Sequence, residues 1–133
     1  MTLYLAALDP RVRKAFVSGY LYGVGDSLLH LNGNCSCNYT PGLWRLLDMG
    51  DIASLIAPRP LLVQSCEEDH LNGSRGLKNV DEQLKIVRDA YKLLGRRDAL
   101  RHEVCPGGHH LGVTHLVEDI EWLDSHVAKC DRA

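Results

Sequence analysis

Two side chains that could share a proton stand in polar turns, each of which follows an apolar run. Asp69 comes shortly after the run Val63–Cys66, and His109 follows Val104–Gly108. Their separation, 109 − 69 = 40 residues, is typical of one strand-helix-strand unit. In open parallel sheets the active groups lie at the carboxyl ends of the strands. The spacing therefore predicts a carboxylate beside an imidazole, the pair that orients the base of a nucleophilic triad.

Both residues also have an ordinary structural interpretation. An aspartate in a polar turn commonly forms that turn, and a histidine beside glycines is commonly a surface residue. His70 and His110, their immediate neighbours, could compete for the same roles. The joint placement of Asp69 and His109 after successive strands is what favours the catalytic hypothesis.

A nucleophile is harder to find in this sequence. Ser18 ends an apolar run, but it has no leading glycine and no helix behind it. Cys105 lies near His109, on a segment where a cysteine is more often a core residue. Gly25-Asp26-Ser27-Leu28 spells the block of another esterase class, yet no aspartate here has a histidine three residues later. Cys35 and Cys37 lack the spaced partner pair of a zinc site, so no metal is expected.

The elements that must position this pair alternate between strand and helix. Apolar runs predict buried strands at 15–19 and 60–66, and a weaker strand is predicted at 100–105. Helices are predicted at 3–8, at 48–57 with Asp51 as cap, at 79–94 with a cap at Asn79, and after a cap at Thr114. The final helix should turn Leu116, Ile120, Leu123 and Val127 inward. This order predicts one α/β domain over residues 1–133, with a parallel sheet and helical crossovers.

Composition excludes several classes of function. The 133 residues carry a formal net charge of −2 and are 45% hydrophobic, so no basic footprint for nucleic acid is present. No apolar run is long enough to cross a membrane. The N-terminus lacks the features of a signal peptide, and five cysteines cannot all pair. We therefore expect reduced thiols and a cytoplasmic protein.

Four stretches resemble the C-terminal half of an α/β-hydrolase, in the acetyl-xylan-esterase and dienelactone-hydrolase-like branch. They are Thr-Leu-Tyr-Leu-Ala-Ala-Leu-Asp-Pro-Arg-Val (2–12), Asp-Ile-Ala-Ser-Leu-Ile-Ala-Pro-Arg-Pro-Leu-Leu-Val-Gln (51–64), Glu-Asp-His (68–70) and Pro-Gly-Gly-His (106–109). The resemblance implies that the three strands are family strands 6–8 of a partial α/β-hydrolase fold. It also implies a short-chain or acetyl ester as substrate and no cofactor.

The same resemblance assigns Asp69 as the acid and His109 as the base of a Ser-Asp-His triad. The family's serine would sit in a Gly-x-Ser-x-Gly elbow just before the helix that ends at Leu8. That elbow is not in this sequence. We therefore expect either an esterase whose nucleophile comes from elsewhere, or a catalytically inactive, truncated module that dimerises or binds a partner.

Residues 20–47 show no clear period and form an expected long loop or insertion. In the family, this position holds a substrate-covering insertion. Tyr22, Tyr39 and Trp44 could line an acyl or aromatic pocket there, or they could simply pack over the sheet.

A second expectation concerns the edge of the sheet. The strand at 15–19 would be internal in a complete fold, but one of its sides has no partner here. Because an uncovered apolar edge favours pairing with another chain, we expect a homodimer through this edge, where the strand would pair with its own copy, or through the faces that the missing half would cover.

Overall fold

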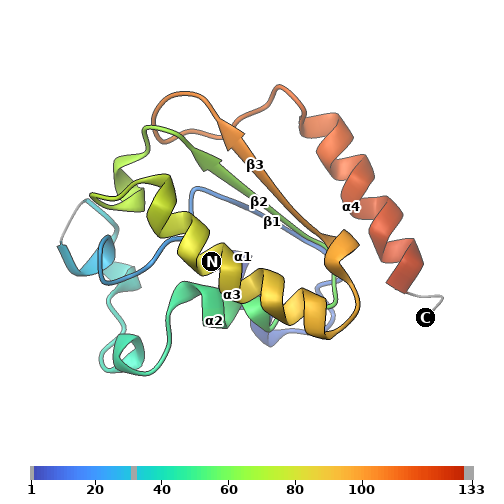
Figure 1. Cartoon of the computed structure of the whole chain (residues 1–133), viewed down its shortest axis with the longest axis horizontal. Helices are drawn as coiled ribbons and strands as arrows, with labels where there is room; N and C mark the ends of the chain where they lie inside the picture. The colour runs from blue at the N-terminus through green and yellow to red at the C-terminus, as the bar shows by residue number, and fades with distance from the viewer. Residues whose placement is uncertain (1, 31–32, 131–133) are drawn as a thin grey trace.

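A three-stranded parallel sheet forms the centre of the molecule (Figure 1). The computed structural model describes residues 2–30 and 33–130. Its strands are β1 (Ala15–Ser18), β2 (Leu61–Cys66) and β3 (Leu100–Cys105), in the spatial order β1-β2-β3. In register, Val17 lies beside Val63, and Val63 lies beside His102. The predicted α/β class, the strand positions and the parallel pairing are confirmed.

Four helices flank this sheet. Helices α1 (Thr2–Leu8), α2 (Met49–Ser54) and α3 (Leu77–Leu93) pack against one another along one face, and α4 (Leu116–Cys130) lies on the opposite side (Figure 1). Single 3-10 turns occur at Leu28–His30, Ser36–Asn38, Leu43–Arg45, His70–Asn72 and Arg97–Ala99. The segment 20–47, where it is described, contains neither α-helix nor strand.

The central strand β2 is buried along its whole length. Helix α3 covers one face of the sheet with the predicted stripe Val80, Leu84, Val87 and Tyr91, all fully buried. Leu94, expected on this stripe, is 51% exposed because the helix ends at Leu93 and Gly95 then takes a positive φ of 69°.

The caps predicted at Asp51 and Asn79 are wrong. Asp48 caps α2 by accepting from the Met49 amide, and Asp51 instead completes the capping box by accepting from the Asp48 amide. Asn79 lies inside α3, where its buried amide donates to the carbonyls of Gly23 and Asn72. Asn79 therefore ties two loops to the helix instead of starting it.

Helix α4 also differs from its prediction. It begins at Leu116, too far along the chain for Thr114 to be its cap. Leu123 is buried as expected, but Ile120 is 45% exposed, and Asp119 and His126 are buried in its place. Arg101 on β3 forms an ion pair with Asp119, at 3.4 Å, and its guanidinium carbon lies 5.9 Å from the centre of the Trp122 ring.

Among the described residues, no helix combines the length and the apolar character needed to cross a bilayer.

Candidate active site

Asp69 and His109, which lie 40 residues apart in the sequence, meet at the carboxyl ends of β2 and β3. The distance from Asp69 Oδ2 to His109 Nδ1 is 2.7 Å. Asp69 follows β2 directly and caps the turn His70–Asn72, and His109 lies on the segment after β3. The structure thus brings together the two residues that the sequence predicted to be neighbours.

The Asp69 carboxylate is buried and has both oxygens engaged. Oδ1 accepts from the Leu71 amide at 2.9 Å, and Oδ2 faces His109, whose own side chain is 48% exposed. An ionised carboxylate can only accept hydrogen bonds, so the proton between these groups belongs to Nδ1. The second ring nitrogen, Nε2, then carries the lone pair and can act as a base toward the solvent side.

Backbone hydrogen bonds set the place of the His109 segment. The Glu67 amide donates to the Cys105 carbonyl and the Glu68 amide donates to the Gly107 carbonyl, both at 2.9 Å. These bonds continue the β2–β3 pairing past the ends of the strands. Gly107, with a φ of 84°, provides the left-handed turn that leads toward His109.

Gly19 is a site residue that the sequence argument missed. A Cβ built there would lie 2.8 Å from His109 Cε1 and 3.5 Å from Asp69 Oδ2. Its φ of 63° also lies in the left-handed region. Only glycine lets the end of β1 approach the imidazole this closely, and the only sequence signal was that a glycine ends the apolar run.

A hollow of about 350 Å³ opens beside His109. Its lining includes Thr2 at the start of α1, Gly19 and Tyr20 at the end of β1, and Cys35 from the long loop. The first described residue of α1 and the imidazole of His109 therefore line the same hollow. Burial raises the pKa of the Tyr20 hydroxyl, so it stays protonated at neutral pH.

The sequence offered three candidate nucleophiles: Ser18, Ser27 and Cys105. Ser18 donates to Gln64 Oε1 at 2.9 Å. Ser27, of the Gly-Asp-Ser-Leu block, is fully buried and donates to the Leu71 carbonyl. Burial raises the pKa of the Cys105 thiol, which disfavours the reactive thiolate. Among the residues that the structure describes, no hydroxyl or thiol forms a hydrogen bond with His109 Nε2.

The two neighbouring histidines make other contacts. His110 Nδ1 faces the Gly108 carbonyl at 2.7 Å, and Cys66 Sγ lies 3.6 Å from the same nitrogen. His70 lies in the turn capped by Asp69, on its exposed side. Neither histidine has a hydrogen bond to the Asp69 carboxylate in the described part of the chain.

The three aromatic residues predicted to contact substrate, Tyr22, Tyr39 and Trp44, do not line the hollow beside His109. Tyr22 is fully buried and donates from its hydroxyl to Asn34 Oδ1 at 2.6 Å. Tyr39 and Trp44 line a separate hollow of about 280 Å³. Trp44 also donates from its indole nitrogen to the Asn38 carbonyl at 3.0 Å. Their proposed contact with substrate stays a prediction.

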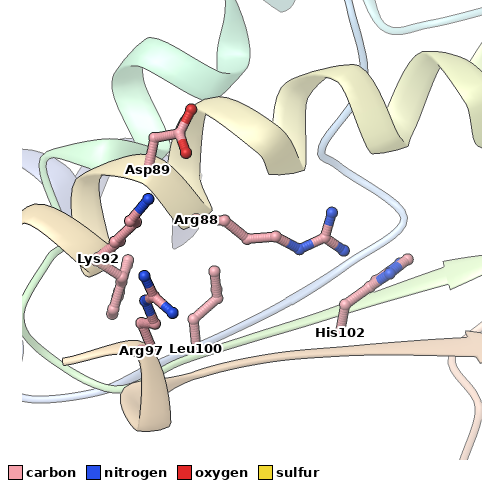
Figure 2. Close-up of a pocket in the computed structure, with 7 residues that line it drawn as sticks. Arg88, Asp89, Lys92, Arg97, Leu100 and His102 are labelled. Atoms are coloured by element: carbon pink, nitrogen blue, oxygen red, sulfur yellow. The ribbon is translucent and has the colours of Figure 1, made fainter.

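A larger hollow, of about 580 Å³, lies at the other end of the strands. Figure 2 shows Arg88, Asp89 and Lys92 of α3 on one side of it and Arg97, Leu100 and His102 on the other. Burial lowers the pKa of His102, whose Nε2 lies 3.2 Å from Ser65 Oγ. No carboxylate orients this imidazole among the described residues, so we place the candidate site at Asp69 and His109.

The described residues contain no cluster of histidine, cysteine, aspartate or glutamate that could hold a metal ion.

Comparison of the sequence with protein families and with curated proteins finds no match. Comparison of the structure with solved structures does. A family 15 carbohydrate esterase, a glucuronoyl esterase from Caldicellulosiruptor kristjansonii, is similar with a TM-score of 0.73 at 15% identity, over 96% of this chain and 40% of that chain. A glucuronoyl esterase from Solibacter usitatus is similar with a TM-score of 0.64 at 16% identity, over 93% and 38%.

A methylesterase is also similar, with a TM-score of 0.64 at 20% identity, over 96% of this chain and 26% of that chain. The chain thus spans at most two fifths of the length of these three structures. At such identities the likeness speaks for the fold alone. The three strands and their flanking helices are arranged as in part of each of these three structures.

Proposed function

We propose that this chain carries the acid and the base of a carboxylic-ester hydrolase that cleaves short-chain or acetyl esters. The observation that supports this proposal best is the 2.7 Å contact between Asp69 Oδ2 and His109 Nδ1 beside an open hollow. The nucleophile, a serine, would come from outside the 133 residues of this chain. Thr2 lines the same hollow as His109, which supports a serine donated to this hollow from ahead of α1.

The proposed reaction is acyl transfer followed by hydrolysis. His109 Nε2 takes the proton of the serine hydroxyl as its oxygen bonds to the ester carbonyl carbon. The buried Asp69 carboxylate stabilises the imidazolium, which then gives the proton to the departing alcohol. In the second half, Nε2 activates a water that releases the acid and restores the serine. No cofactor takes part in this proposal.

Two finer assignments belong to the same proposal. The acetyl-xylan-esterase and dienelactone-hydrolase-like branch is supported by residues 51–64 and 106–109 of the sequence. The solved structures that match are named glucuronoyl esterases and a methylesterase, so esters of sugar acids are the first substrates to compare with acetyl esters. The cytoplasmic location also remains a proposal.

The competing proposal is a catalytically inactive module that dimerises or binds a partner. It is favoured by the lack of any described hydroxyl bonded to His109 Nε2. This proposal predicts that the hydrogen bond between Asp69 and His109 is present and that the chain does not hydrolyse esters.

Ester turnover and active-site labelling distinguish these two proposals. The chain joined to a segment that carries the Gly-x-Ser-x-Gly elbow ahead of Thr2 is assayed with p-nitrophenyl acetate and with a serine-directed fluorophosphonate, alongside His109→Ala, Asp69→Asn and the control His110→Ala. The esterase proposal predicts turnover that is lost in His109→Ala, strongly reduced in Asp69→Asn and kept in His110→Ala. Equal rates in wild type and His109→Ala, or neither turnover nor adduct in wild type, would overturn it for this chain.

A further inference from the structure

Gln64 is a buried polar residue in the middle of strand β2, with 2% of its surface exposed. Both ends of its amide are occupied. Oε1 accepts from Ser18 Oγ and from the Gly112 amide, each at 2.9 Å, and Nε2 donates to the Gly112 carbonyl at 3.0 Å. One side chain on the central strand therefore reaches the end of β1 and the segment that follows β3.

The two hydrogen bonds to Gly112 form a specific clasp on the backbone. The Gln64 amide donates to the Gly112 carbonyl and accepts from the Gly112 backbone amide, as the backbone groups of two paired strands do. A Cβ at Gly112 would lie 3.0 Å from Gln64 Nε2 and 2.3 Å from Cys105 Sγ, so glycine is needed for this close approach. Because the amide is buried, losing these bonds would leave unsatisfied polar groups without water.

The position of Gly112 connects this clasp to the candidate site. Segment 107–112 carries His109, and the Glu68 amide holds its first residue through the Gly107 carbonyl at 2.9 Å. Gln64 holds its last residue. With both ends attached to β2 and the turn after it, the imidazole is kept beside Asp69, which extends from the same strand.

We propose that Gln64 is a positioning residue that holds the His109 segment so that Nδ1 faces Asp69. This role rests on the proposed function, because it gives Gln64 an effect on the base without any contact with substrate. Gln64 does not line the hollow beside His109. A residue with only a structural role would change stability and leave the His109 hydrogen bond as it is in the folded protein.

Nitrogen-15 NMR of the imidazoles tests this proposal on the chain as it exists. In wild type we expect His109 to hold its proton on Nδ1, and the Gly112 amide to exchange slowly with solvent. Gln64→Met removes both bonds to Gly112 and is expected to give a mixed His109 tautomer and roughly tenfold faster Gly112 exchange. Gln64→Glu keeps the acceptor but faces the Gly112 carbonyl with a second oxygen, and it should have the same effect at neutral pH.

Two matched controls separate positioning from general destabilisation. Ser18→Ala removes the Ser18 bond to Gln64 and leaves both bonds to Gly112, so His109 should keep its tautomer. Gln83→Met removes another buried amide, which accepts from the Gly50 amide at 2.8 Å on the α2–α3 side. It should lower stability without changing the signals of His109.

The outcomes distinguish the positioning role of Gln64 from the proposed esterase function. If folded Gln64 variants keep the wild-type His109 tautomer, the positioning role is wrong. Fast exchange of the Gly112 amide in wild type also overturns it, and this measurement does not depend on any variant folding. If the wild-type His109 tautomer is unchanged in Asp69→Asn, the acid-base pair behind the proposed function is absent in solution.

Discussion

The imidazole of His109 lies directly against the backbone of Gly19: a methyl group there would come within 2.8 Å of Cε1. This contact joins the end of β1 to a residue that follows β3, although the strand β2 separates the two. Gly19 therefore lies beside the contact between His109 Nδ1 and Asp69 Oδ2, because a Cβ there would come within 3.1 Å of the first atom and 3.5 Å of the second.

Gly19→Ala is therefore expected to displace His109 from Asp69. The new methyl overlaps the ring, and the φ of 63° adds strain of about 1 kcal/mol for any residue with a Cβ. We expect a lower melting temperature and loss of the Nδ1-protonated His109 signal in NMR. Gly25→Ala is the matched control, because a Cβ there meets nothing within 4 Å. An unchanged His109 signal in folded Gly19→Ala would show that the ring is not held against β1.

Ser27→Ala is expected to affect stability and not chemistry. The Ser27 hydroxyl is fully buried and donates to the Leu71 carbonyl, so its removal should cost about 1 kcal/mol of unfolding free energy. Denaturant unfolding measures this loss. Ester turnover per folded molecule and fluorophosphonate labelling should stay at their wild-type levels. Loss of labelling at unchanged stability would instead support the esterase class that the Gly-Asp-Ser-Leu block names.

Glu103 is expected to make the protein less stable as pH rises. Burial raises the pKa of its carboxyl, and the nearby Asp119 carboxylate raises it further, against the opposing effect of Arg101. A carboxyl whose pKa is higher in the folded state binds its proton more tightly there. Its contribution to stability is present below the unfolded pKa and is lost as pH rises through the folded value.

Glu103→Gln should accordingly raise the melting temperature at pH 7 by a few degrees and flatten its pH dependence above pH 4.5. Thermal unfolding between pH 4 and pH 8 measures both effects. Glu121→Gln, at an exposed position of α4, serves as the control. A lower melting temperature at pH 7 in Glu103→Gln would show that the ion pair with Arg101 outweighs the cost of burial.

Dimer formation can be tested at the open edge of β1, on the side that does not pair with β2. The amides of Ala15 and Gly19 donate to the carbonyls of Pro60 and Gln64, on the β2 side. Because successive backbone amides of a strand point to opposite sides, the Phe16 amide points to the open edge. We expect the purified chain to sediment as a dimer at micromolar concentration. Phe16→Pro removes the outward donor and keeps the β1–β2 ladder, so it should give a folded monomer. A wild-type monomer under these conditions contradicts the expected pairing.

Local pattern was enough to predict the elements that carry the site. The apolar run of β2 and the stripe of α3 are periodic over neighbouring residues, and burial follows directly from that period. The 40-residue spacing of Asp69 and His109 then needed only the rule that successive parallel strands lie side by side. These features could be read from the sequence because each depends on short stretches of chain.

Only the tertiary structure decided which groups the remaining polar side chains meet. Asn79 resembled a helix cap, but it bonds to carbonyls on two other loops, and Gln64 resembled one more residue of a buried strand, but it clasps Gly112. In the sequence Gly19 only marked the end of a strand, whereas in the structure the His109 ring packs against it. A buried amide must find a partner wherever the fold brings one, and that partner can lie 48 residues away in the sequence.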